Sequence, residues 1–226
     1  MANLQTEFCG LQFKNPLIMA SLETTNSPDL IKQAIDYGAA GAIIKTLTDI
    51  DDMAVLTMNS KYCIMDEHGE IIKGKVPRDF KFYSRSGYSN TYYKDWAPCL
   101  KELSAYARER DAYLIGSAGA KDIGGWKNIC RTIEDCGLPM VELNFGCPHP
   151  AMMPGVHGGS MIGQVADVAF EVTKQVCDVV DIPVMVKLTP DQSQPVAIAK
   201  AVRDAGAAAA ASRAQPPSER ALERRH

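Results

Sequence analysis

The sequence predicts an α/β fold built on a parallel sheet. Short apolar runs, typical of buried strands, alternate along the chain with longer segments whose apolar residues recur every three or four positions, as they do in helices. Nearly continuous apolar strands are typical of parallel strands covered on both faces, in an open sheet or in a barrel. About five strand–helix units follow one another before the pattern ends near residue 206.

The first elements are short. Residues 4–8 and 11–13 predict a β-hairpin, and residues 16–20 predict a buried strand. Ser27 and Pro28 then indicate the start of a helix, because serine caps helices and proline suits their first turn. The glycine at the end of this helix would be Gly38, and residues 42–44 predict the next strand.

Residues 47–95 form an irregular stretch. It contains one predicted hairpin, in which residues 62–65 pair with residues 70–72. A long irregular stretch inside a compact domain is usually functional, and a surface excursion is the alternative.

Regular alternation returns after residue 95. The predicted helices are residues 96–110, 126–136, 165–180 and 195–205, and the predicted strands are residues 113–117, 140–144 and 183–188. Residues 1–206 are therefore expected to form one domain. The Ala-, Arg- and Pro-rich residues 207–226 are expected to be a disordered tail. A closed eight-stranded barrel takes about 250 residues, so five units are too few to close one.

Composition excludes several classes of function. The 226 residues carry a net charge of -3, with a pI near 5.8, so neither a nucleic acid nor an anionic membrane is an expected partner. A signal peptide is not expected from the first residues, and no apolar run approaches the roughly 18 residues of a membrane span. The 7 cysteines form no Cys-x-x-Cys pair, so neither a zinc nor an iron–sulfur site is expected. A cytoplasmic protein with reduced thiols is the simplest account.

Reactive side chains gather at predicted strand ends. Asn144, Cys147 and His149 follow one buried strand, and Lys45 and Lys187 end two others. A lone cysteine is most often a structural residue, and a lone lysine often reaches solvent. Parallel strands bring their carboxyl ends to one edge, however, so these groups would share a rim. A rim with cations and an amide suits an electron-rich planar ligand such as a flavin.

Four segments carry a resemblance to a known family. Residues 15–21, 43–46, 142–149 and 186–190 resemble, in order, motifs of the dihydroorotate dehydrogenase-like flavin barrels. The Cys-Pro-His segment is most similar to the flavin domain of dihydropyrimidine dehydrogenase. The resemblance implies a TIM-type (β/α)₈ barrel with FMN at its carboxyl rim, of which this chain holds about the first five units, with an N-terminal hairpin and an irregular C-terminal tail.

The resemblance also implies residue roles. Lys45 and Asn144 would bind the substrate, and Cys147 would be the general acid or base. The reaction would reduce or form the 5,6 double bond of a pyrimidine, with hydride exchanged at flavin N5. The FMN contacts would come from Ala20, Ser21, Lys45, Thr46, Asn144 and Lys187. A subunit carrying iron–sulfur, FAD or NAD(P) would exchange electrons with the flavin, and a complete barrel would form a homo-oligomer.

Some family features are not recognisable. The usual Asn-rich substrate segment is replaced by residues 85–90, where Asn90 is the candidate. The Asn-Thr pair after the sixth strand and the glycine-rich phosphate strands are absent. Gly155, Gly158 and Gly159 would allow a mobile lid after Cys147. Two alternatives stay open, namely a truncated relative without activity and a Schiff-base aldolase that uses Lys45 or Lys187.

Overall fold

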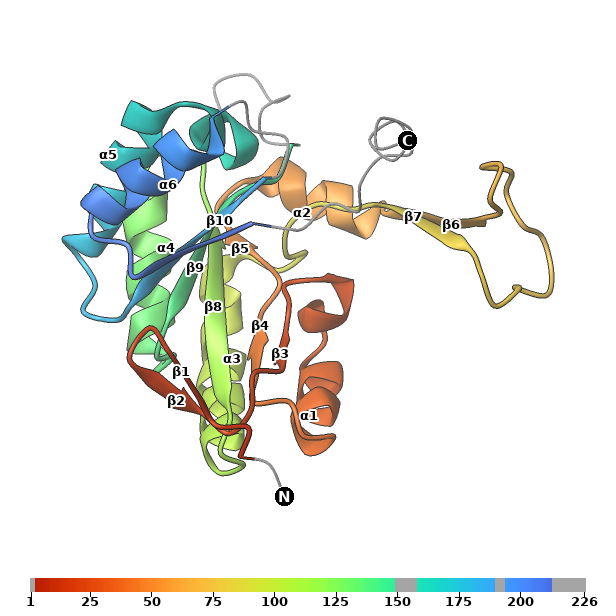
Figure 1. The fold of residues 1–226 in the computed structure, drawn as a ribbon, viewed down its shortest axis with the longest axis horizontal. Coiled ribbons are helices and arrows are strands. Elements are labelled where there is room, and N and C mark those ends of the chain that lie inside the picture. The colour runs from red at the N-terminus through yellow and green to blue at the C-terminus, as the bar shows by residue number, and fades with distance from the viewer. Residues whose placement is uncertain (1–2, 149–157, 190–193, 213–226) are drawn as a thin grey trace, which may run out of the picture.

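The computed structural model describes residues 3–148, 158–189 and 194–212. Its centre is one curled parallel sheet, whose six main strands lie side by side in the order of the sequence (Figure 1). This is the strand order of a barrel of the TIM type, so the predicted partial barrel is confirmed. The short strand β5 (Leu47–Thr48) pairs with the end of β8. The six main strands are β3 (Ile18–Met19), β4 (Gly41–Ile43), β8 (Tyr113–Gly119), β9 (Val141–Phe145), β10 (Val184–Leu188) and β11 (Ala209–Ser212).

Five helices pack on the outer face of this sheet, as expected for strand–helix units (Figure 1). Their starts follow the sequence signals. The Ser27 hydroxyl accepts a hydrogen bond from the Leu30 amide, and Asp122 accepts one from Gly125. The helices are α1 (Pro28–Asp36), α3 (Tyr93–Arg108), α4 (Ile123–Asp135), α5 (Ala166–Cys177) and α6 (Pro195–Asp204). Two short 3₁₀ helices, Glu23–Asn26 and Gly159–Gln164, lie in loops at the carboxyl edge.

The two faces of the strands differ in chemistry. On β9, Val141, Leu143 and Phe145 join the main hydrophobic cluster with the helices. Glu142 and Asn144 alternate with them and therefore point to the inside of the curl. Near the amino ends of the strands the inside is apolar, and the hairpin of β1 (Thr6–Phe8) and β2 (Leu11–Phe13) packs against it. This inner apolar cluster consists of Phe13, Ala40, Ile43, Ile115, Met140 and Met185.

The irregular stretch contains more structure than the sequence predicted. Helix α2 (Asp51–Met58) was not expected, because its apolar residues do not share one face. Strand β6 (Lys61–Met65) pairs antiparallel with β7 (Lys81–Arg85), and the two form an arm that extends from the body (Figure 1). The predicted hairpin with residues 70–72 is present as a short pairing: Met65 forms a bridge with Ile71, and the Ile72 amide donates to the Ile64 carbonyl at 2.8 Å. The longer pairing of β6 with β7 was not predicted.

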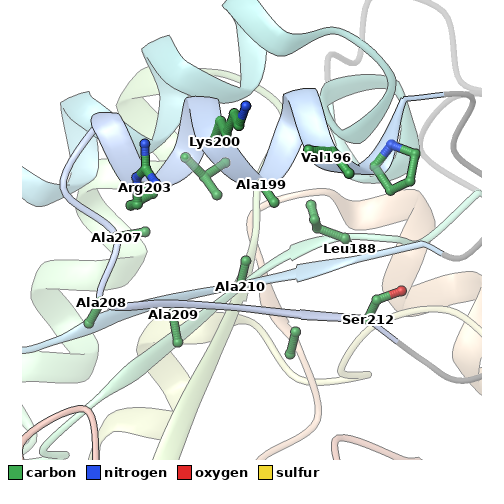
Figure 2. Close-up of a pocket in the computed structure, with 13 residues that line it drawn as sticks. Leu188, Val196, Ala199, Lys200, Arg203, Ala207, Ala208, Ala209, Ala210 and Ser212 are labelled. Carbon is green, nitrogen blue, oxygen red and sulfur yellow. The ribbon is translucent and has the colours of Figure 1, made fainter.

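The predicted disorder from residue 207 was wrong for the first residues of that segment. Ala209–Ser212 form β11, which pairs in parallel register with β10. An alanine run has weak strand propensity, but its backbone groups can still complete the ladder of a neighbouring strand. Small side chains leave a groove of about 530 Å³ between β11 and α6 (Figure 2). Residues 213–226 lie outside the described residues.

Candidate active site

The structure brings most of the predicted site residues to one rim. Lys45 and Thr46 follow β4 after one intervening residue, and Asn144 lies opposite Lys187 in the parallel pairing of β9 with β10. Ser21, half-buried, and Ala20, exposed, directly follow β3 at the same edge. None of these residues lines the groove beside β11, which is therefore a separate feature of the fold.

A chain of hydrogen bonds links four neighbouring strands at this rim. Lys187 Nζ contacts Glu142 Oε1 at 2.5 Å, and the Ser117 hydroxyl donates to the same oxygen at 3.2 Å. Ser117 Oγ and Thr46 Oγ1 are 3.0 Å apart, and Asn144 Nδ2 donates to Thr46 Oγ1 at 3.0 Å. We call these five residues the rim network. A buried carboxylate needs such partners, because desolvation of an unpaired charge is costly.

Sequence reasoning missed two members of the rim network. Glu142 is 2% exposed and Ser117 is fully buried. One signal was present in the sequence, because Glu142 lies two residues before Asn144 in the same strand and must share its face. An ionisable residue inside an apolar strand, in phase with a predicted site residue, is itself a site candidate.

Lys45 is the second cation of the rim. It is 8% exposed, and its Nζ lies 3.3 Å from Oε1 of Glu23, in the 3₁₀ helix after β3. Burial alone would raise the pKa of Glu23. The charge of Lys45, together with hydrogen bonds from the Glu23 backbone, Lys45 and Ser86, lowers that pKa instead. The pair thus holds a buried ammonium in place, and Glu23 is a further residue that the sequence did not indicate.

Cys147 is half-buried in the loop after β9. It packs against a small cluster of Ile50, Met53 and Tyr88, all from the stretch between β4 and α3. Burial, and then the neighbouring Cys147, raise the pKa of Tyr88 well above its usual value. His149 lies outside the described residues, as does Gly155 of the predicted lid.

The family follows from a sequence comparison. The model of the family described as dihydroorotate dehydrogenase matches residues 82–211, more than half of the chain. The chain belongs to this family. The resemblance of the chain to this family is therefore confirmed.

Characterised relatives have similar sequences. The dihydroorotate dehydrogenase B (NAD(+)) catalytic subunit of Methanocaldococcus jannaschii is 28% identical over 203 residues, which cover 90% of this chain and 60% of that protein. The NAD-dependent dihydropyrimidine dehydrogenase subunit PreA of Escherichia coli K12 is 25% identical over 209 residues, covering 91% of this chain and 46% of that protein. The Thermoplasma acidophilum dihydroorotate dehydrogenase B catalytic subunit is 26% identical, covering 92% and 61%. The chain thus spans about half to three fifths of the length of these relatives.

Asn90, the candidate for the family's substrate segment, does not join the rim network. Its side chain is exposed and accepts a hydrogen bond from Asn26 Nδ2 at 2.8 Å. Its neighbour Ser89 is buried, and the Ser89 amide donates to the Thr46 carbonyl at 2.8 Å. This segment therefore reaches the rim through its backbone and through Tyr88, whereas the Asn90 side chain contacts the 3₁₀ helix after β3.

Among the described residues, neither a metal-binding cluster nor a membrane-spanning helix is present. No group of three or more His, Cys, Asp or Glu side chains in them is arranged to hold a metal ion. Of the helices in the described part of the chain, none combines the length and the apolar character that crossing a membrane requires.

Proposed function

We propose that the rim serves a flavin-dependent oxidoreductase that acts on the CH–CH bond of a dihydropyrimidine, with FMN as the cofactor. The observation that carries the proposal is the rim network in a chain of the dihydroorotate dehydrogenase family. Dihydroorotate and dihydrouracil or dihydrothymine are the substrate candidates. Relatives of both dehydrogenase types are similar to the chain, which supports this choice.

The residues fit the ring of a flavin. The side chain of Lys187 is 30% exposed while that of its partner Glu142 is buried, so Lys187 is the accessible member of this pair. A cation there would stabilise negative charge on the pyrimidine edge of the ring. Ala20 and Ser21 are small and accessible, so a planar group could approach the backbone closely. Among the described residues we find no glycine-rich strand end that would hold the phosphate.

Bound FMN would supply the hydride chemistry, and the chain would supply proton transfer and orientation. Asn144 donates one amide hydrogen to Thr46 and accepts from the Gly146 amide at 3.1 Å. These two bonds fix its orientation and leave its second amide hydrogen for a ligand. Lys45, fixed by Glu23, would bind the substrate beside the ring. Cys147 would exchange a proton with the substrate carbon, since the pKa of a thiol can be tuned to such a task.

The aldolase alternative has less support. A lysine that forms a Schiff base must have its amine free to attack a carbonyl carbon. Both candidate lysines are paired with a carboxylate, Lys187 with Glu142 and Lys45 with Glu23. The inactive alternative is an outcome of the experiment below.

A flavin titration tests the proposal. The purified chain is titrated with FMN, and binding is followed by the visible absorption spectrum. We expect about one equivalent to bind, and Lys187→Ala to weaken binding 10- to 100-fold, because a charge-assisted contact is lost. Lys174→Ala is the matched control, since Lys174 pairs with Asp178 on the exposed face of α5. A chain that takes up no FMN would contradict the proposal and favour the inactive alternative.

A second experiment tests the substrate and the acid. Flavin-loaded protein is mixed with dihydroorotate or dihydrouracil, and bleaching of the flavin band is recorded in a single turnover. Cys147→Ser should slow bleaching at least 100-fold while FMN binding is kept, because a general acid or base contributes roughly 10²–10⁴-fold. Equal rates for the two proteins would exclude Cys147 as the acid or base. We further propose a separate electron-transfer subunit, since two relatives are named as catalytic subunits. A cytoplasmic location is also proposed.

A further inference from the structure

Tyr88 places a buried hydroxyl beside Cys147. The residue is 2% exposed, and within the described residues its Oη forms no hydrogen bond with a nitrogen or an oxygen atom. Buried polar groups in proteins are nearly always hydrogen-bonded, so a buried hydroxyl without such a partner needs an explanation. Cys147 packs against the same cluster, and its sulfur is a weak hydrogen-bond acceptor that becomes a strong one when ionised.

The fold holds the Tyr88 backbone in place from two sides. The Thr57 hydroxyl of α2 donates to the Tyr88 carbonyl at 2.5 Å, and the next amide, of Ser89, donates to the Thr46 carbonyl. The preceding residue must be small, because a Cβ on Gly87 would lie 2.2 Å from the Met53 carbonyl oxygen. The backbone around Tyr88 is thus held both by Thr57 of α2 and by Thr46 of the rim network.

The Tyr88 ring is held as closely as its backbone. It fills the space above Gly119 at the end of β8, where a Cβ would lie 2.6 Å from Tyr88 Cε2. Gly119 therefore permits an approach that another residue would block. Because the backbone and the ring of Tyr88 are both held in place, directing its hydroxyl at one neighbour costs little further conformational entropy.

The surroundings make a hydrogen bond to Cys147 valuable. Ile50 and Met53 complete the cluster, and apolar contacts disfavour a thiolate. Within the described residues, Cys147 is the group whose negative charge raises the pKa of Tyr88. Burial keeps the Tyr88 phenol protonated far above neutral pH, so it stays available as a donor.

We propose that Tyr88 is a positioning residue that donates a hydrogen bond to the sulfur of Cys147. The bond fixes the direction of the thiol and stabilises the thiolate that remains after proton transfer. In the reductive direction the S–H bond of Cys147 breaks, its proton forms a C–H bond on the substrate, and sulfur keeps the electron pair. The hydride for the neighbouring carbon belongs to the reduced flavin of the proposed function, on which this role of Tyr88 rests. Tyr88 keeps its own proton throughout.

The test measures the thiol and needs no turnover. Alkylation of Cys147 by iodoacetamide is followed from pH 6 to 10 in the folded full chain, with the labelled peptide quantified by mass spectrometry. Tyr88→Phe removes the hydroxyl and keeps the ring. We expect the apparent pKa of Cys147 to rise by about one unit, a tenfold loss of thiolate at a fixed pH, because a hydrogen bond to a charged atom is lost.

Tyr113→Phe is the matched control, since Tyr113 packs on Phe13 at the opposite end of β8. A second measurement uses wild-type protein whose tyrosines carry fluorine, which makes the phenol a stronger donor. There we expect the pKa of Cys147 to fall, and the fall to disappear in Tyr88→Phe. An unchanged pKa in both Tyr88→Phe and the fluorinated protein would overturn the proposal.

The two proposals fail in different ways. If Cys147→Ser keeps full turnover while Tyr88→Phe shifts the thiol pKa, the hydrogen bond exists and the assigned acid is wrong. If Cys147→Ser abolishes turnover and Tyr88→Phe leaves the thiol pKa unchanged, the acid is right and Tyr88 has no positioning role.

Discussion

Replacing Lys187 by methionine tests the energetic basis of the rim network. Methionine keeps the length and apolar stem of lysine but removes the ammonium, so Glu142 loses its ion-pair partner. Glu142 is 2% exposed and cannot turn to solvent. Breaking a buried ion pair from one side costs about 3–5 kcal/mol. Because Lys187 is itself 30% exposed and Ser117 still donates to Glu142, we expect the lower end, about 3 kcal/mol.

The assay is urea unfolding of the wild type, the two single variants Lys187→Met and Glu142→Met, and the double variant, which together form a double-mutant cycle. For a chain of this size, about 3 kcal/mol corresponds to a fall in Tm of roughly 6–12 °C. Glu142→Met alone should lower the free energy of unfolding by about 1 kcal/mol or less, since the partly exposed Lys187 side chain can reach water. The double variant should lie within about 1 kcal/mol of the wild type, because a buried pair can often be exchanged for apolar residues of similar volume. Additive losses in the double variant would refute the coupling.

Three further outcomes are expected. Gly119→Ala should destabilise the protein by about 1–3 kcal/mol in urea unfolding, because the new methyl group overlaps the Tyr88 ring, whereas Gly124→Ala, which meets only the flexible Asp122 side chain, should stay within about 1 kcal/mol of the wild type. Glu23→Gln should cost about 1 kcal/mol or less at pH 7. The folded pKa of Glu23 lies below its ordinary value of 4.5, so its contribution is complete above that pH and is lost as the pH falls through the folded pKa; a cost that grew in acid would contradict this sign. The folded pKa of Tyr88 lies above its ordinary value of 10.0, so the free energy of unfolding should fall as the pH rises beyond 10. Tyr88→Phe should therefore move the alkaline unfolding midpoint to higher pH. In the wild type, ionisation of Tyr88, followed by absorbance at 295 nm, should not precede unfolding.

Local signals were sufficient for the repeating units. Ser27 and Pro28 mark the start of a helix by their own chemistry, and the apolar run of β9 marks a buried strand without reference to any partner. The shared rim followed from one rule, that parallel strands end on the same side, and Asn144 does lie opposite Lys187. Their catalytic and cofactor roles, and the division of the chain at residue 206, stay predictions.

Features that depend on distant partners escaped the sequence. The partner of β6 is set by the course of the long connection to β7, where the turn signal at residues 68–69 favoured a nearer strand. Strand β11 exists because β10 offers it a backbone ladder, which the alanine run itself does not reveal. Tyr88 looked like one aromatic residue among many in an irregular stretch, and its burial over Gly119 is purely a tertiary contact.

The alanine strand sets a gradient of local stability across the sheet. Strands β8, β9 and β10 are paired on both sides, whereas in the described part of the chain β11 is paired with β10 alone and its side chains bury little apolar area. Amide hydrogens should therefore exchange fastest in β11 and slowest near β9, since protection follows the free energy of local opening. When β11 opens locally, β10 becomes the edge strand, and Lys187 is the rim residue on β10. The cation of the rim network therefore lies between the stable centre of the sheet and the strand that opens most easily.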